Sequence, residues 1–403
     1  MKLVIKVNIK PLLTGYILTA IAFFLLTSIT VGQAQTNKKK AEGSEPELLS
    51  EAYEGMFKIG VALNRWQIGE ENSQSTPLIA KHFNTITPEN LMKWSRIHPQ
   101  PNEYSFEAAD RFVEFGEKHD MFIVGHTLVW HSQIPDWTFE DENGDDLSRE
   151  ALLQRMKDHI STVVGRYKGR VDAWDVLNEA ATWSDGLRKS KWLEIIGEEY
   201  INKAFEYAHE ADPGAELYYN DYNLWAPDKR ETVVKMVRRL QQNDVPIHGV
   251  GMQAHLGLDS PSLDDIEASI KAFSELGVKV MITELDVSVL PSRDDVNVSY
   301  NPDEGQGSYG DVPEELNPYK EELSDSVQQQ LRDRYVELFE LFKKHQDKID
   351  RVTFWGLNDR QSWLNNFPIP GRTDYPLLFN RNNEPKPAFQ GVLEGAGRKE
   401  GIK

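Results

Sequence analysis

Residues 171–180 read VDAWDVLNEA, and this stretch decides the fold that we expect. Trp174, Val176 and Leu177 supply the aromatic, β-branched and apolar content of a buried strand. The apolar run then stops on an amide that is followed directly by Glu179. In barrels of alternating strands and helices, chemistry lies at the carboxyl ends of the strands. The stretch therefore predicts a barrel strand that ends in a functional carboxylate.

A second stretch of the same kind follows later in the chain. Residues 278–283 read VKVMIT, and Glu284 comes directly after them. Glycoside hydrolysis requires two acidic side chains that flank one bond of the substrate. We therefore expect Glu179 and Glu284 to face each other across a sugar-binding site.

The pattern of apolar residues alternates between strand-like and helix-like segments from about residue 50 onward. The expected strands are 57–63, 83–87, 121–130, 171–178, 216–221, 249–255, 278–283 and 351–357. The expected helices are 106–118, 149–167, 194–211, 229–243, 262–276 and 326–345. Strands and helices in this alternation predict an α/β protein with a (β/α)8 TIM barrel in a single domain.

The composition excludes several classes of function. Of the 403 residues, 39% are hydrophobic and 27% are charged, which is typical of a soluble globular protein. The formal net charge is -19 and the body of the chain has no basic block, so we expect no nucleic-acid partner. Cysteine is absent, which excludes disulfides and thiolate metal sites. We expect a monomer that uses no cofactor and no metal.

The first 34 residues have the pattern of a secretory signal. Lysines at positions 2, 6 and 10 precede an apolar run over 12–31, and small residues at 32 and 34 form a cleavage site after Ala34. We expect a periplasmic or extracellular protein with no membrane partner after cleavage. An uncleaved anchor is the alternative, because the run approaches the ~20 residues needed to span a bilayer. The expected regions are the signal at 1–34, a flexible leader at 35–47, the catalytic domain at 48–393 and a tail at 394–403.

One long segment departs from the alternation of strands and helices. Residues 291–317 are rich in Asp, Asn, Ser, Gly and Pro and have no apolar periodicity. The segment follows the expected strand at 278–283, so it belongs to the face that carries the carboxylates. Two interpretations stay open: a disordered surface insertion, or a wall of the substrate cleft.

Polar and aromatic residues gather in five motifs at the ends of the expected strands. In chain order these are ENLMKW at 89–94, HTLVWHSQIP at 126–135, WDVLNE at 174–179, ITELD at 282–286 and FWGLND at 354–359. With these motifs in this order, the chain resembles glycoside hydrolase family 10, the endo-β-1,4-xylanases, over roughly residues 48–393. The resemblance implies a retaining hydrolysis of xylan, with Glu179 as acid/base and Glu284 as nucleophile.

The resemblance also implies roles for the residues around the pair. His255 and Asp286 would orient the nucleophile, and Asn178 would face the 2-hydroxyl of the sugar. The substrate-binding residues that it implies are Glu89, Asn90, Lys93, His126, Trp130, Gln133, Tyr222, Gln253, Trp355 and Trp363. An aromatic lid over C5 leaves room for xylose and crowds the exocyclic CH2OH of glucose, which favours xylan over cellulose.

Three alternatives are weighed against this interpretation. A barrel glycosidase that acts on β-glucan or mannan would keep the mechanism and change the substrate. A non-catalytic xylan-binding barrel would need neither carboxylate, yet both are present. A zinc site at His126 and His131 is disfavoured, because these residues lie five apart on a strand and not four apart on a helix.

Overall fold

The computed structural model describes residues 48–68, 74–183, 186–291 and 312–397. The expected signal at 1–34 and leader at 35–47 lie outside the described residues, as does most of the segment 291–317. Within the described ranges, no helix is long and apolar enough to cross a membrane.

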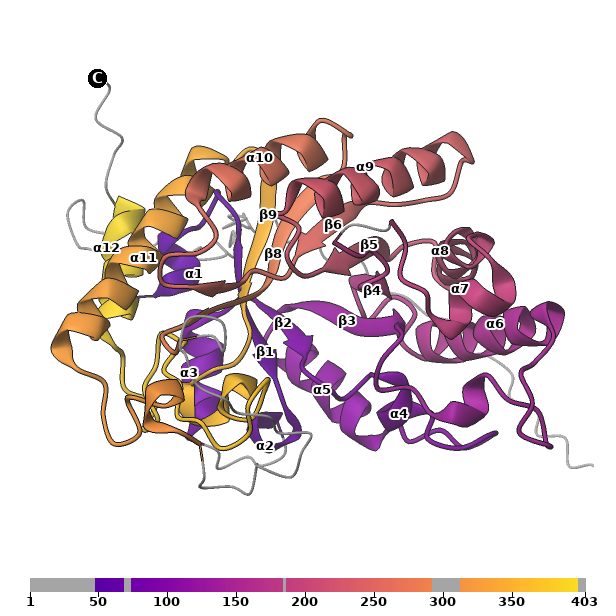
Figure 1. The fold of residues 1–403 in the computed structure, drawn as a ribbon, viewed down its shortest axis with the longest axis horizontal. Helices are drawn as coiled ribbons and strands as arrows, with labels where there is room; N and C mark the ends of the chain where they lie inside the picture. The colour runs from indigo at the N-terminus through magenta and orange to yellow at the C-terminus, as the bar shows by residue number, and fades with distance from the viewer. Residues whose placement is uncertain (1–47, 69–73, 184–185, 292–311, 398–403) are drawn as a thin grey trace, which may run out of the picture. The chain divides into compact units, whose positions relative to one another are not determined.

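Parallel strands close into a barrel, which confirms the predicted (β/α)8 fold (Figure 1). The order around the barrel is β1-β2-β3-β4-β5-β6-β8-β9, and β9 pairs with β1 to complete it. A short β7 continues from β6 and pairs with β8. The strands are β1 Lys58–Leu63, β2 Thr85–Pro88, β3 Phe122–Val129, β4 Ala173–Asn178, β5 Glu216–Asp221, β6 Gly249–Met252, β7 His255–Gly257, β8 Lys279–Ser288 and β9 Ile349–Phe354.

The longer helices lie outside the strands and cover them (Figure 1). The α-helices are α1 Leu49–Ala52, α2 Arg65–Ile68, α3 Ser75–His82, α4 Trp94–Ile97, α5 Glu107–Lys118, α6 Arg149–Arg166, α7 Lys191–Ile196, α8 Glu199–Ala211, α9 Pro227–Gln242, α10 Leu263–Ser274, α11 Asp325–Lys344 and α12 Pro387–Gly397. Short 3-10 helices occur at Asp136–Thr138, Glu314–Leu316, Asp359–Gln361 and Trp363–Asn365. Serine side chains begin several helices; Ser148, for example, accepts a hydrogen bond from the main chain of Ala151 at the start of α6.

The structure corrects two of the predicted elements. The helix expected over 194–211 is two helices, α7 and α8, because Gly197 has a φ of 84° and ends the first of them. The strand expected over 249–255 is divided into β6 and β7, because Ala254 has a φ of 62°. The expected domain boundary at residue 393 falls inside α12, which continues to Gly397 with Leu393 and Ala396 buried.

The first residues of β4 also pack against the outside of the barrel. Trp174 is buried and lies beside Gly125 of β3 in the strand register. A Cβ atom at Gly125 would approach the Trp174 ring to 2.2 Å. The absence of a side chain at Gly125 is what allows the indole to lie flat across the neighbouring strand.

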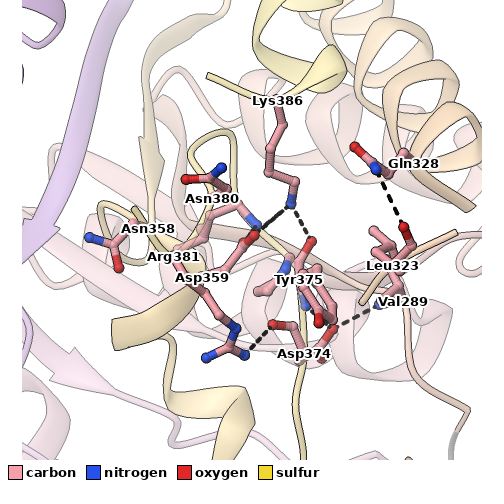
Figure 2. Close-up of polar contacts among 12 residues, drawn as sticks. Val289, Leu323, Gln328, Asn358, Asp359, Asp374, Tyr375, Asn380, Arg381 and Lys386 are labelled. Carbon is pink, nitrogen blue, oxygen red and sulfur yellow. Dashed lines mark hydrogen bonds and ion pairs between the residues drawn. The ribbon is translucent and has the colours of Figure 1, made fainter. Parts of the chain in front are cut away.

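A buried ion pair anchors the connection between β9 and α12 (Figure 2). Lys386 Nζ lies 2.9 Å from Asp359 Oδ2, and both side chains are buried. In the same connection, Asp374 accepts a hydrogen bond of 3.1 Å from the main-chain N–H of Val289, just beyond the end of β8. These contacts fix the segment that carries Trp363, one of the predicted substrate-binding residues.

We predict that Gly125→Ala lowers the free energy of unfolding by about 1–3 kcal/mol or more, because the new methyl group overlaps the Trp174 ring. The measurement is chemical denaturation followed by tryptophan fluorescence. Gly165→Ala is the control: Gly165 is an exposed residue of α6, and a Cβ there would have no neighbour within 4 Å. The control should be stabilised by up to about 1 kcal/mol. Equal effects of the two substitutions would contradict the packing described for Trp174.

Candidate active site

Both predicted carboxylates lie at one cavity of about 580 Å³ at the carboxyl ends of the strands. Glu179 follows β4 and is half-buried, while Glu284 belongs to β8 and is buried. The predicted site residues that line the cavity are Lys93, His126, Trp130, Gln133, Asn178, Glu179, Tyr222, Gln253, His255, Glu284, Trp355 and Trp363.

Glu284 is held by partners on both of its oxygens. Asn220 Nδ2 donates to Glu284 Oε1 over 2.7 Å, and His255 Nε2 lies 3.3 Å from Oε2. The other ring nitrogen of His255 lies 3.0 Å from Asp286 Oδ1. Trp363 donates its indole N–H to the second oxygen of Asp286 over 2.8 Å. The nucleophile predicted from the sequence therefore sits at the end of a chain of fixed contacts.

The electrostatics of this chain favour an ionised Glu284. Burial lowers the pKa of His255, but the carboxylate of Asp286 and then that of Glu284 outweigh it and raise the pKa to about 10. His255 is therefore an imidazolium at neutral pH and donates to both carboxylates. Burial raises the pKa of Glu284, but the hydrogen bond from His255 and the charges of His126, His255 and Lys93 lower it below its ordinary value.

Two amide side chains connect Glu179 to Glu284. Asn178 Nδ2 donates to Glu179 Oε1 over 3.2 Å, and Gln253 Nε2 donates to the same oxygen over 3.1 Å. Asn178 Oδ1 accepts from Asn220 Nδ2 over 3.0 Å, and this same amide donates to Glu284. The two carboxyl groups are thus separated by two side-chain amides, across a water-accessible cavity.

A second group of polar residues lies on the β2 and β3 side of the cavity. Lys93 Nζ donates to Asn90 Oδ1 over 2.9 Å and lies 4.9 Å from the centroid of the Trp130 ring. Asn90 Nδ2 donates to Glu89 Oε1 over 3.1 Å. Burial raises the pKa of Glu89, and Lys93 opposes that shift. Donors and acceptors in fixed positions beside an aromatic face suit the hydroxyl groups and C–H faces of a sugar ring.

Three predicted residues take supporting positions behind the cavity surface. Asp286 contacts His255, Glu89 contacts Asn90, and Asn90 contacts Lys93. None of the three predicted residues is among those that line the cavity. His126 does line the cavity, and its Nδ1 lies 2.9 Å from Asp175 Oδ2, so a structural carboxylate fixes its ring.

Several residues at the site were not included in the predicted set. The additional residues that line the cavity are His131, Ser132, Asn223 and Phe367. Asn220 contacts Glu284 directly, and its place at the end of an expected strand was the available signal. Phe367 is 57% exposed and stacks on Trp363 with centroids 5.1 Å apart, and nothing in the sequence pattern marks it.

In the part of the chain that the structure describes, no group of three or more His, Asp or Glu side chains is arranged to hold a metal ion. The chemistry that the site can perform with its own groups is nucleophilic attack by Glu284 and proton transfer by Glu179.

Comparisons with known proteins identify the family of the chain. The model of glycosyl hydrolase family 10 matches residues 48–395. The endo-1,4-beta-xylanase A of Xylanibacter ruminicola is 44% identical over 338 residues, which are 84% of this chain and 90% of that protein. A GH10 endoxylanase from a sugarcane soil metagenome is 47% identical with a TM-score of 0.80, covering 87% of this chain and all of that chain. A mutant structure in complex with xylotriose is 37% identical with a TM-score of 0.77, over 87% of this chain and all of that one. With a family model that spans nearly the whole described chain and relatives well above 30% identity, the chain belongs to glycosyl hydrolase family 10.

Proposed function

We propose that this protein is an endo-acting β-1,4-xylanase that hydrolyses xylan with retention by a double displacement. The observation that carries the proposal is the environment of the two glutamates: an imidazolium keeps Glu284 ionised, and the amides of Asn178 and Asn220 link Glu179 to it at one cavity. Retention requires carboxyl groups about 5–5.5 Å apart.

In the first half-reaction, Glu284 attacks the anomeric carbon and forms an ester with the sugar. The bond from C1 to the glycosidic oxygen breaks, and Glu179 donates its proton to that oxygen. The step therefore requires Glu284 as a carboxylate and Glu179 as a carboxylic acid when the substrate binds.

In the second half-reaction, esterification has removed the charge of Glu284. Glu179, now ionised, accepts a proton from a water molecule that attacks C1. The ester bond breaks, Glu284 returns as a carboxylate, and the sugar leaves with its β configuration. Asn178 supports both steps where it faces the 2-hydroxyl of the sugar.

The aromatic walls favour a pentose polymer as substrate. Trp355 and Trp363 line the cavity from the β9 side, and the rings of His255 and Trp363 are 4.8 Å apart. We propose that these indoles crowd the exocyclic CH2OH of a hexose and accept xylose, which lacks that group. The remaining predicted binding residues that line the cavity would hydrogen-bond to the sugar chain or stack on it; these are Lys93, His126, Trp130, Gln133, Tyr222 and Gln253. Glu89 and Asn90 would support Lys93.

We infer, finally, that the protein is exported and acts as a monomer in the periplasm or outside the cell. The inference is supported by the basic start, the apolar run over 12–31 and the small residues before Gln35. N-terminal sequencing of the mature protein should begin at Gln35, and an intact N-terminus would support a membrane anchor.

We predict that the purified protein releases reducing ends from xylan faster than from carboxymethylcellulose or mannan, by about 10-fold or more, because the indole wall excludes a hexose. Proton NMR should show the β-anomer as the first product. An α-anomer would exclude retention, and binding of xylan without release of reducing ends would favour the non-catalytic alternative.

We predict that Glu179→Ala lowers the rate on xylan by about 10²–10⁴-fold, because the leaving oxygen then departs without a proton. Aryl xylobiosides with strongly acidic phenols should keep most of their activity in the first step, since such leaving groups need no protonation. Steady-state and burst kinetics on a series of phenols provide the measurement. An equal loss on all leaving groups would contradict the role of Glu179 as acid.

We predict that His255→Asn moves the acidic limb of the kcat/KM profile to higher pH by about one unit or more. The acidic limb reports ionisation of the nucleophile in the free enzyme. Since the hydrogen bond from the imidazolium lowers the pKa of Glu284, its removal raises that pKa, and activity is lost earlier as the pH falls. His131→Asn is the control: His131 lines the same cavity but contacts the Trp130 ring edge-on. An acidic limb that stays in place in His255→Asn would contradict the assigned electrostatics.

A further inference from the structure

A second buried ion pair lies directly behind the acid/base. Lys229 Nζ is 2.7 Å from Asp221 Oδ1, and neither side chain has any exposed surface. Asp221 is the last residue of β5, and Lys229 lies in the first turn of α9. The catalytic steps described above use neither residue. Replacing a buried ion pair by well-packed apolar residues is often neutral or stabilising, so folding stability alone does not explain this pair.

Asp221 fixes the main chain that follows Glu179. Its Oδ2 accepts the main-chain N–H of Ala181 over 3.3 Å and also the hydroxyl of Tyr219. The Tyr219 hydroxyl in turn accepts the N–H groups of Ala180 and Ala181, each over 3.1 Å. Glu179 itself has a φ of 58°, a left-handed conformation that non-glycine residues rarely adopt. Asp221 and Tyr219 therefore hold in place the turn that aims the acid/base.

The other oxygen of Asp221 organises the cavity wall beside Glu179. Oδ1 accepts the main-chain N–H of Tyr222 over 2.9 Å, and Lys229 Nζ lies 3.4 Å from the centroid of the Tyr222 ring. Arg188 donates through Nη2 to the Tyr222 hydroxyl over 2.8 Å and through Nε to the carbonyl of Glu179 over 2.9 Å. Two cations, Arg188 and Lys229, thus lie behind Glu179, and Asp221 pairs with Lys229.

The charges that face Glu179 come from several elements. Glu284 of β8 supplies a negative charge at the same cavity. The cations near Glu179 are Lys93 after β2, Arg188 after β4 and Lys229 of α9. His131 beside Arg188 and Lys229 has a pKa lowered to about 4 by burial and by those two charges, so it is neutral at working pH.

We propose that Asp221 is a positioning residue of the acid/base: it fixes the turn at Glu179 and holds Lys229 behind that turn, so that Glu179 points its carboxyl group at the leaving oxygen. The proposal rests on the xylanase mechanism proposed above. It assigns a role in the reaction to a residue that does not line the substrate cavity.

The chain offers a matched control in the Asp359–Lys386 pair of Figure 2. This pair is also buried, with its charged atoms 2.9 Å apart, and burial raises the pKa of both aspartates to about 6. Asp359 accepts the main-chain N–H of Leu377 over 2.9 Å, in the connection between β9 and α12, and has no part in the turn at Glu179. Loss of either aspartate leaves a buried lysine without its partner, so the cost to folding should be similar.

The test compares Asp221→Asn with Asp359→Asn in the full-length protein, using phenyl xylobioside, whose leaving group needs a proton. Both variants should unfold at lower denaturant concentration than the wild type. In Asp221→Asn alone, kcat/KM on phenyl xylobioside should fall by about 10-fold or more, because a displaced Glu179 delivers its proton poorly to the leaving oxygen. An aryl xylobioside that needs no proton should lose far less activity.

An equal loss on both substrates in Asp221→Asn, or the same selective loss in Asp359→Asn, would overturn the proposal. If Asp221→Asn does not fold, Lys229→Met serves instead: loss of the ion pair should again lower kcat/KM more on phenyl xylobioside than on the substrate that needs no proton, and an equal loss on both would overturn the proposal. Wild-type protein that fails to hydrolyse xylan and phenyl xylobioside would contradict the proposed function itself, which is a separate outcome.

Discussion

The charged hydrogen bond between His255 and Glu284 is the interaction on which the rest of the site depends. It keeps a buried carboxylate ionised, because the imidazolium supplies the counter-charge that water cannot. Asp286 keeps the imidazole protonated, and it lies two residues after Glu284 on β8, so both side chains point to the same face of that strand. Closure of the barrel brings β7 alongside β8 and completes the contact.

Buried charges recur behind the catalytic pair and tie its supporting loops to the barrel. Asp221 and Lys229 connect the end of β5 to α9, and Asp359 and Lys386 connect the end of β9 to the start of α12. Each pair also makes a hydrogen bond to the main chain of its loop: Asp221 accepts the N–H of Tyr222, and Lys386 donates to the carbonyl of Tyr375. The loops that carry the acid/base, Tyr222 and Trp363 are consequently held by electrostatic contacts as well as by packing.

The sequence predicts the barrel and most of the residues that line the cavity, because apolar runs that end in polar residues mark both. It does not predict the break between β6 and β7, because the left-handed φ of 62° belongs to Ala254, and alanine is not a residue type that indicates such a conformation. It also misses Asn220 as a partner of Glu284, because that contact arises from the register that places Asn220 beside Asn178 on the neighbouring strand. Phe367 is missed for a similar reason: its stacking on Trp363 depends on how the loop after β9 folds back.

Trapping of the covalent intermediate tests the central claim most directly. A 2-deoxy-2-fluoro xylobioside with a good leaving group should inactivate the protein, since the fluorine slows the second displacement far more than the first. Mass spectrometry of the digested protein should then find one glycosyl group, attached to the peptide that contains Glu284. A label on another residue, or continued turnover with no label, would contradict the assignment of Glu284 as the nucleophile and the double displacement built on it.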